Sequence, residues 1–174
     1  MRSNPIRLIS ALALFALVLL TATRFYEFDE PIWRFLTGRG RINPVTLHLE
    51  GEFVESNLGA SRAADGTVVV RLIAEQFNFV PRCVRVPQGV PVHFRITSGD
   101  VVHLLTFAGT DYRLKAVPGV INEAHFVFSR PGAYPVPCQE FCGAGHYAMR
   151  SELRVVPPDQ FASLPPHQGG TCEQ

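Results

Sequence analysis

The richest set of chemically active side chains lies near the C-terminus, within residues 138–149. Cys138, Cys142, His146 and Met149 fall in this one short stretch, and all four side chains are soft or borderline metal ligands. A mixture of thiolate, imidazole and thioether favours copper, because sulfur ligands select soft ions and imidazole accepts copper readily. A zinc site would more often hold four Cys or His ligands and no Met. The stretch therefore predicts a copper site.

The number of ligands of each type points beyond a single copper ion. A blue copper site uses two His, one Cys and a weak axial Met, whereas residues 138–149 offer one Cys more and one His fewer. One arrangement uses every ligand: two coppers bridged by both thiolates, each capped by one His and one weaker ligand. The second imidazole must then come from elsewhere in the chain. The alternative is a structural disulfide between Cys138 and Cys142, with an incidental His and Met beside it.

The spacing Cys-x-Glu-x-Cys-Gly-x-x-His-x-x-Met resembles the signature of the binuclear copper A (CuA) centre in subunit II of haem–copper cytochrome c oxidases. In that family the second imidazole lies upstream, in a segment reading Asp-Val-x-His. Residues 100–103 match this segment and end at His103, and the block Lys115-Ala-Val-Pro-Gly119 follows. The resemblance runs over residues 68–156 and is strongest to the small, single-anchor members of the family.

The resemblance implies a complete ligand set for two copper ions. Its members are Cys138 and Cys142 as bridging thiolates, His103 and His146 as terminal imidazoles, and Met149 and the backbone carbonyl of Glu140 as weak axial ligands. In the family, a Glu at the position of Glu140 can also help to bind a magnesium ion at the junction with subunit I. The resemblance therefore implies two copper ions as cofactors, with magnesium shared between the two subunits.

The implied function is electron transfer within a terminal oxidase. The chain would accept electrons from cytochrome c, or a similar small donor, and pass them to haem in subunit I, where oxygen is reduced to water. The sequence has no nucleophile–base pair and no phosphate-binding loop, so we expect no complete active site in this chain alone. The runner-up interpretation is a membrane-anchored copper-delivery protein of the Cys-x-x-x-Cys type, which would have a thioredoxin-like fold.

Bulk properties and periodicity predict an all-β domain. The chain has 174 residues, a net charge of +1 and no basic run, so nothing indicates nucleic-acid binding. Apolar residues alternate at Val68, Val70 and Leu72, and similar alternation recurs between Gly- and Pro-rich turns. Short strands at this spacing favour a β-sandwich. By resemblance we expect a cupredoxin-like Greek-key sandwich over residues 67–157.

The N-terminal region predicts a membrane anchor. Residues 8–23 are uncharged and apolar, and Arg7 and Arg24 flank them. A span of roughly 20 residues crosses a bilayer, and flanking arginines can snorkel to the interface. We therefore expect one retained transmembrane helix within residues 1–25, with a cleaved signal peptide as the alternative. The site chemistry places the C-terminal domain outside, and the resemblance implies a single-pass protein of the bacterial inner membrane with its copper domain on the periplasmic side.

Composition guides the interpretation of the remaining segments. Residues 26–66 mix aromatic, charged, Gly and Pro residues without periodicity, which predicts a juxtamembrane linker. Residues 158–174 are rich in Pro, Gly and Gln, which predicts a disordered tail. The sequence leaves open whether Cys83 and Cys172 pair as a disulfide in an oxidising compartment.

The position at which electrons enter is predicted from two aromatic residues. Some family members attract a basic cytochrome c with carboxylates and pass the electron through an exposed Trp near the copper. Here the only tryptophan, Trp33, lies in the juxtamembrane segment, and basic side chains outnumber acidic ones over residues 67–156. Phe77 and Phe79 are two residues apart and would share one strand face. We expect one of them to lie where a neutral or acidic donor docks; the alternative places both in the core.

Overall fold

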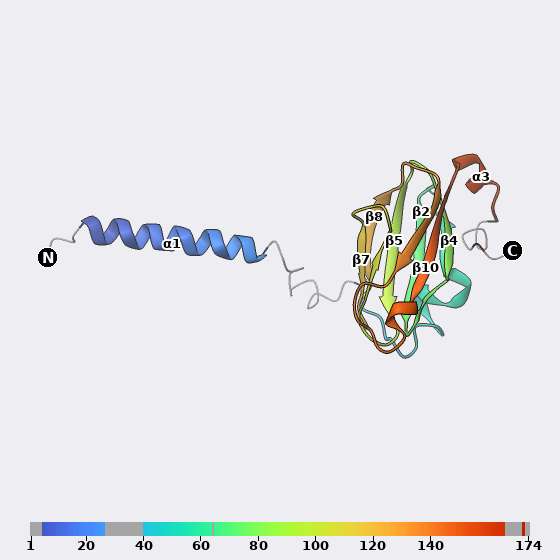
Figure 1. The fold of residues 1–174 in the computed structure, drawn as a ribbon, viewed down its shortest axis with the longest axis horizontal. Helices are drawn as coiled ribbons and strands as arrows, with labels where there is room; N and C mark the ends of the chain where they lie inside the picture. Colours follow the sequence, from blue (N-terminus) through green and yellow to red (C-terminus); the bar gives the residue numbers. More distant parts are fainter. Residues whose placement is uncertain (1–4, 27–39, 64, 166–171, 173–174) are drawn as a thin grey trace. The chain divides into compact units, whose positions relative to one another are not determined.

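The computed structural model describes residues 5–26, 40–63, 65–165 and 172 (Figure 1), and the chain divides into two compact units, Met1–Arg39 and Gly40–Gln174. Helix α1 (Pro5–Tyr26) is the element of the first unit. Among the described residues, no helix was found that is long and apolar enough to cross a membrane. The predicted anchor therefore stays a prediction.

The second unit is built from β-strands. Their bounds are β1 (Gly59–Arg62), β2 (Val68–Glu75), β3 (Asn78–Val80), β4 (Cys83–Pro87), β5 (Pro91–Ser98), β6 (His103–Thr106), β7 (Arg113–Ala116), β8 (Asn122–Val127), β9 (Gly132–Pro137) and β10 (Arg150–Val156). One sheet has the order β1-β2-β5-β8, with β3 paired to β2; another has the order β4-β10-β9; β6 and β7 form a third pair. The prediction of an all-β domain is confirmed.

Short helical elements complete the described part of this unit. They are helix α3 (Pro158–Ala162) and the 3-10 turns η1 (Gly51–Phe53), η2 (Glu55–Asn57) and η3 (His146–Ala148), the last of which lies between β9 and β10. The pairings of β2 with β5 and of β4 with β10 are parallel, while the other ladders are antiparallel. Parallel neighbours need crossover connections, and the crossovers bring chain segments that are distant in sequence to the same end of the sandwich.

The main core lies between the sheets, where the alternating apolar residues meet. Val68, Val70 and Leu72 point inward as the period of two requires. An aromatic cluster fills the middle: the ring centroid of Phe94 lies 5.4 Å from that of Phe107 and 5.4 Å from that of Phe126. Such close ring pairs add to the stabilisation from apolar burial. This core supports the loops that carry the predicted ligands.

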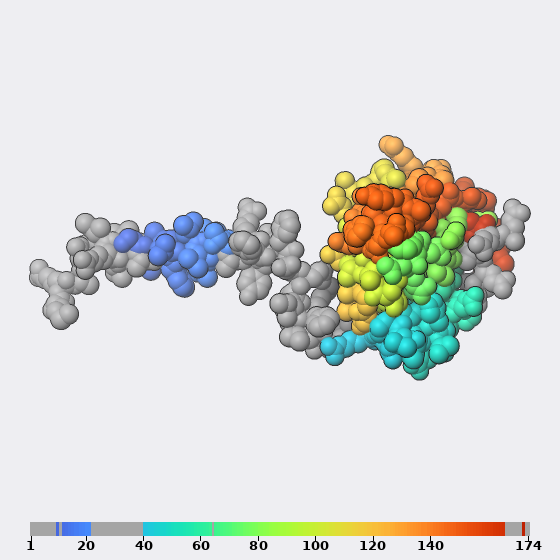
Figure 2. Space-filling view, turned by 60° about the horizontal axis from the view of Figure 1, so that its bottom comes forward, coloured from blue at the N-terminus to red at the C-terminus, as the bar shows by residue number. Residues whose placement is uncertain are grey.

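Residues 40–63 belong to the β-sandwich unit, which corrects the prediction that they form a linker. Leu47 and Phe53 are fully buried and pack with Leu58 and Ile73 in a second apolar cluster on the other face of β2. Strand β1 lies on the edge of the sheet, and Figure 2 shows the segment as a continuous cyan layer on the unit. Sequence patterns offered little sign of this because the apolar residues follow no fixed period. Residues 27–39, which include Trp33, lie outside the described residues.

The segment after β10 is also more ordered than predicted. Helix α3 buries Phe161 in the main core, and Arg62 lies over its ring at 5.5 Å from the centroid. Cys172 forms a disulfide with Cys83 of β4, which resolves the question that the sequence left open. Two described parts of the predicted disordered tail are therefore fixed to the sandwich, while residues 166–171 and 173–174 lie outside the described residues.

Candidate metal centre

The predicted ligands come from one loop and from the start of strand β6, which meet at one end of the sandwich. The connection between β9 and β10, residues 138–149, carries two cysteines, a histidine and a methionine. Its two ends are held together by the bond from Cys138 N–H to the Met149 carbonyl, 3.1 Å. Cys138 also forms an isolated bridge with Leu105 of β6, the strand that begins at His103. The hairpin thus places the cysteine loop directly beside the upstream histidine.

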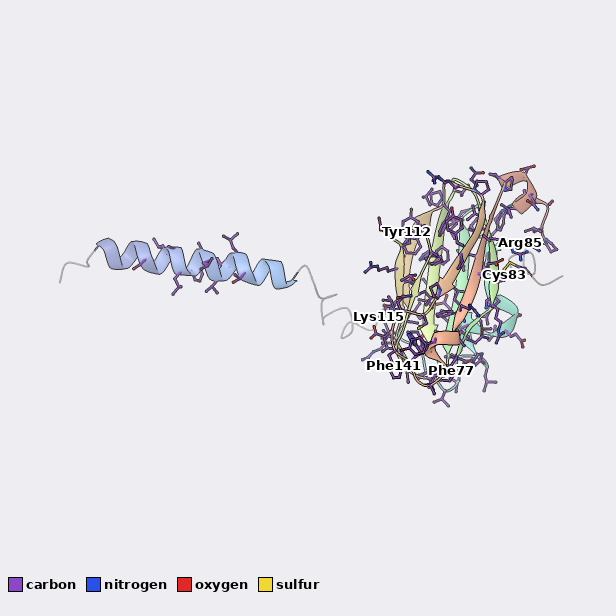
Figure 3. The ribbon with its side chains drawn as sticks, viewed as in Figure 1. Phe77, Cys83, Arg85, Tyr112, Lys115 and Phe141 are labelled. Atoms are coloured by element: carbon purple, nitrogen blue, oxygen red, sulfur yellow. A yellow bond between two sulfur atoms is a disulfide. The ribbon has the colours of Figure 1, made fainter. Side chains whose placement is uncertain are left out.

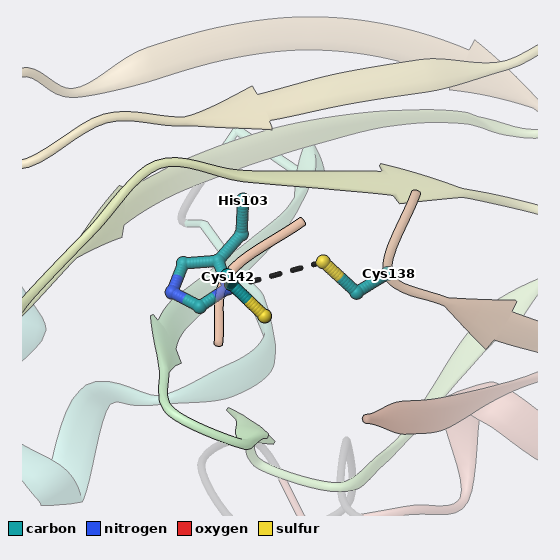
Figure 4. Close-up of side chains that lie close together, drawn as sticks. All are labelled: His103, Cys138 and Cys142. Carbon is teal, nitrogen blue, oxygen red and sulfur yellow. Dashed lines mark hydrogen bonds between the residues drawn. The ribbon is translucent and has the colours of Figure 1, made fainter. Parts of the chain in front are cut away.

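Each cysteine sulfur lies close to one imidazole nitrogen. The Cys138 Sγ is 3.9 Å from His103 Nδ1, and the Cys142 Sγ is 3.6 Å from His146 Nδ1. Figure 4 shows the first of these contacts as a dashed line. One ligand atom from each of His103, Cys138 and Cys142 lies within 4.8 Å of the others. His146 joins this group through its contact with Cys142.

Each sulfur also lies near one weaker donor. The Cys138 Sγ is 3.2 Å from the Glu140 carbonyl oxygen, and the Cys142 Sγ is 3.6 Å from the Met149 Sδ. The donors therefore fall into two similar sets, each with a thiol, an imidazole nitrogen and a weak ligand. Soft sulfur with imidazole suits copper better than magnesium or calcium, which prefer oxygen. The residues present fit the predicted metal.

A carboxylate fixes the orientation of the buried histidine. His103 Nε2 lies 2.9 Å from Asp100 Oδ1, so Nδ1 is the nitrogen that faces the sulfurs. Asp100 also accepts hydrogen bonds from the backbone N–H groups of Gln76 and Val101, each at 2.6 Å. Burial would raise the pKa of Asp100, but the bonds from His103, Gln76 and Val101 outweigh it and lower that pKa. Partners of this kind hold metal-binding histidines in the correct tautomer.

The two thiols are free and buried. Cys138 and Cys142 are each 5% exposed, so the alternative of a structural disulfide between them is not what the structure holds. Burial, and then the neighbouring Cys138, raise the pKa of Cys142 to about 11. The Cys142 thiol is therefore protonated at neutral pH until a metal displaces its proton.

One side of the site faces solvent through aromatic residues. His146 is half-buried, and its ring centroid lies 5.7 Å from that of Phe141 and 5.3 Å from that of Tyr147. These two neighbours are 73% and 91% exposed. Sequence reasoning did not single them out, although both flank predicted ligands. By contrast, His103 and Met149 are fully or almost fully buried.

The two phenylalanines predicted for electron transfer lie in different environments. Strand β2 ends at Glu75 and β3 begins at Asn78, so Phe77 lies in a turn and does not share a strand face with Phe79. Phe79 is fully buried, and its ring and that of His103 are in a T-shaped arrangement at a centroid distance of 6.3 Å. Phe77 is half-buried, and Figure 3 shows it at the same end of the sandwich as Phe141. The core interpretation therefore holds for Phe79, and Phe77 alone remains near the surface.

The β-sandwich unit is similar in sequence to a known family. Residues 69–156 match the family described as cytochrome c oxidase subunit II, periplasmic domain. Two relatives named cytochrome c oxidase subunit 2, both from Thermus thermophilus, are 32% identical to this chain over 115 residues. The matched part is 66% of this chain, 85% of one relative and 68% of the other.

Solved structures show the same fold. The periplasmic domain of subunit II of the Bradyrhizobium japonicum cytochrome oxidase is 23% identical, with a TM-score of 0.50, over 55% of this chain and 88% of that one. One chain of a heme-copper terminal oxidase dimer is 26% identical, with a TM-score of 0.52, over 88% of this chain and 100% of that one. The sandwich is the cupredoxin-like fold that the sequence predicted.

Proposed function

The chain belongs to the cytochrome c oxidase subunit II family, and from this membership we propose that it is the electron-transfer subunit of a haem–copper terminal oxidase, with a binuclear copper centre. The observation that carries the proposal is the pairing of donors, in which each cysteine sulfur has its own imidazole nitrogen and weak ligand. The runner-up, a copper-delivery protein, needs a thioredoxin-like fold, whereas the described domain is a β-sandwich.

The residues of this chain would hold two copper ions in a rigid, largely dry setting. Cys138 and Cys142 would bridge the ions, His103 and His146 would cap them, and Met149 and the Glu140 carbonyl would be weak ligands. When bound, the copper pair would supply a centre that gains and loses one electron. Asp100 keeps the Nδ1 of His103 available, and β9 and β10 fix both ends of the cysteine loop. Ligands held in this way move little between redox states, which favours fast transfer.

The exposed aromatic surface beside His146 is our proposed docking site for the donor. Phe141, Tyr147 and the half-buried Phe77 would contact cytochrome c or a similar small protein. Because basic side chains outnumber acidic ones over residues 67–156, docking would be mainly apolar. The bimolecular electron-transfer rate should then change little with ionic strength, because screening acts on charge steering with a Debye length of ~10 Å at about 0.1 M salt. A steep fall in rate with added salt would contradict apolar docking.

The remaining parts of the proposal concern the complex and the membrane. Electrons would leave toward haem in subunit I, and the Glu140 carboxylate would help to hold a magnesium ion at that junction.

The uncharged residues 8–23 would form a single anchor in the bacterial inner membrane, with the copper domain on the periplasmic side. Protease protection of tagged chains in spheroplasts tests this topology: a copper domain protected from external protease would contradict it.

Copper content and spin state test the central proposal. The full chain, purified from its native membrane and then separated from its partner subunits, should contain two coppers and one unpaired electron shared by both nuclei. It should also carry the visible absorption of thiolate-to-copper charge transfer. One copper per chain, with the spin on a single nucleus, would overturn the binuclear proposal. Co-purification of a haem-containing subunit would support the proposed complex, and its absence would argue for the delivery function.

A further inference from the structure

The turn between β2 and β3 lies against both ligand-bearing loops. It consists of Gln76 and Phe77, since β2 ends at Glu75 and β3 begins at Asn78. Gln76 is exposed and Phe77 is half-buried. Neither residue is among the predicted metal ligands. Together, however, they contact the cysteine loop and the loop that leads to His103.

Gln76 makes one hydrogen bond to each loop. Its backbone N–H donates to Asp100 Oδ2 at 2.6 Å, and Asp100 in turn holds His103 Nε2 at 2.9 Å. Its side-chain Nε2 donates to the carbonyl oxygen of Cys142. A single residue therefore links the backbone of one cysteine to the carboxylate that orients the upstream histidine.

The ring of Phe77 packs on two glycines of the cysteine loop. A Cβ added to Gly145 would lie 2.5 Å from Cγ of Phe77 and 2.8 Å from its Cε2, far inside van der Waals contact. Gly145 has a φ of −89° and a ψ of 6°, a conformation open to residues with a side chain. The ring of Phe77 is therefore what forbids a side chain at this position. Gly143 differs, because its φ of +131° requires glycine whatever lies nearby.

We propose that Gln76 and Phe77 form a clasp that sets the position of the cysteine loop relative to His103. They are positioning residues: Gln76 acts through the Cys142 backbone and Asp100, and Phe77 acts by packing on Gly145. The clasp holds the thiols close to His103 before any metal binds, so the site is pre-arranged. This inference deepens the proposed function and rests on the same ligand set.

Thiol accessibility in the metal-free full chain tests the role of Gln76. In Gln76→Ala, alkylation of Cys138 and Cys142 should accelerate about fivefold. The reason is that loss of one hydrogen bond should shift the equilibrium between the closed and the open cysteine loop by about that factor. The matched control is Gln88→Ala, because Gln88 Nε2 also donates to a backbone carbonyl, that of Ser129, at 2.9 Å. The control should leave the alkylation rate unchanged. Equal rates in the wild-type chain and Gln76→Ala would overturn this part of the clasp.

A double-mutant cycle tests the packing of Phe77 on Gly145. Gly145→Ala alone should speed alkylation strongly and change the copper hyperfine pattern of the loaded chain. In a Phe77→Ala background, adding Gly145→Ala should change either readout little, because the obstructing ring is gone. Gly143→Ala should be harmful in both backgrounds, since its backbone conformation is the reason for glycine there. Additive effects of Phe77→Ala and Gly145→Ala would overturn the packing argument.

Folding of each variant is checked by the far-UV circular dichroism spectrum and by an intact Cys83–Cys172 disulfide. If Gly145→Ala does not fold alone but folds with Phe77→Ala, that rescue supports the clasp; failure to fold in both backgrounds contradicts it. Alkylation of the metal-free chain does not depend on copper number. The clasp can therefore fail while the binuclear centre stands, and the binuclear centre can fail while the clasp stands.

Discussion

The β-sandwich unit contains two cysteine pairs in opposite chemical states. Cys83 and Cys172 are 89 residues apart in sequence and form a disulfide, with a Cα–Cα distance of 5.2 Å. Cys138 and Cys142 lie in one loop, are buried and remain free thiols. The first pair joins strand β4 to the C-terminal segment, where Cys172 N–H also bonds to the Cys83 carbonyl at 3.3 Å. The second pair is surrounded by atoms that could bind a metal.

The difference between the two cysteine pairs follows from the atoms that surround each pair. Near Cys138 and Cys142, two imidazole nitrogens, a thioether and a carbonyl all lie within 4 Å of a sulfur. Near Cys83 the side-chain contact is with Glu152 Oε1 at 3.7 Å, a group that offers no soft ligand. Soft donors make the surroundings of Cys138 and Cys142 suitable for copper, while the long sequence separation of Cys83 and Cys172 suits a structural crosslink.

Replacing one cysteine from each pair gives the largest expected contrast. Cys142→Ser should abolish the copper centre, because a hydroxyl is harder and far less acidic than a thiol and cannot bridge two soft ions. Cys83→Ser should keep copper and its visible spectrum. Copper per chain by elemental analysis, together with the absorption spectrum, measures both. Retained charge-transfer absorption in Cys142→Ser would contradict the assignment of Cys142 as a copper ligand.

Air oxidation of the metal-free chain should cause the next largest effect. The two free sulfurs belong to a group of ligand atoms within 4.8 Å of one another, so a new disulfide between Cys138 and Cys142 should form and block most copper uptake. A thiol reductant should restore uptake under conditions that leave Cys83–Cys172 oxidised. Mass spectrometry of alkylated peptides reports each pair separately. Full copper uptake by oxidised chain, without reductant, would contradict the expected block.

Loss of the structural disulfide should lower stability without altering the metal site. Cys172→Ser opens a crosslink that spans 89 residues, and disulfides closing such long loops typically stabilise by about 2–4 kcal/mol. The free energy of unfolding in urea should fall by that amount, with copper content and spectrum unchanged. The Cys83→Ser variant should fall by a similar amount, and a clear difference between them would show that one cysteine has a second role.

The raised pKa of Cys142 predicts a smaller, pH-dependent loss in the metal-free chain. Folding favours the protonated thiol, whose pKa is about 11 against an ordinary value of 9.0. This contribution is complete below pH 9 and is lost as pH rises through about 11, and a shift of this size is at most about 2–3 kcal/mol. Urea unfolding at pH 8 and pH 10.5 measures it, with Cys142→Ser as the control. An equal pH dependence in both chains would exclude Cys142 as the source.

Sequence reasoning predicted the candidate metal ligands more readily than the parts that support them. Five of the six predicted ligands, including the Glu140 carbonyl, lie in one hairpin loop, so their proximity follows from short-range spacing. The burial of Leu47 and Phe53, and the seating of Phe161 in the core, depend on contacts with distant strands and follow no period. The Phe77–Phe79 prediction assumed a continuous strand, whereas the chain turns at Gln76 and Phe77. Local patterns predicted elements and ligands, and long-range packing decided the rest.

The smallest expected effect comes from Met149, which distinguishes a bridging ligand from a tuning one. Its Sδ lies 3.6 Å from the Cys142 Sγ, and the side chain is 1% exposed, so Met149→Leu keeps the apolar volume while removing the thioether. Volume-conserving swaps of this kind usually cost less than about 1.5 kcal/mol. A weak axial ligand tunes the redox potential more than it binds the metal. We therefore expect most of the copper to remain, with a shifted potential and an altered hyperfine pattern. Redox titration and elemental analysis of the purified variant measure the two quantities. Loss of copper as complete as in Cys142→Ser would show that Met149 is needed for binding as much as the thiolates are. That outcome would contradict the assignment of Met149 as a weak ligand.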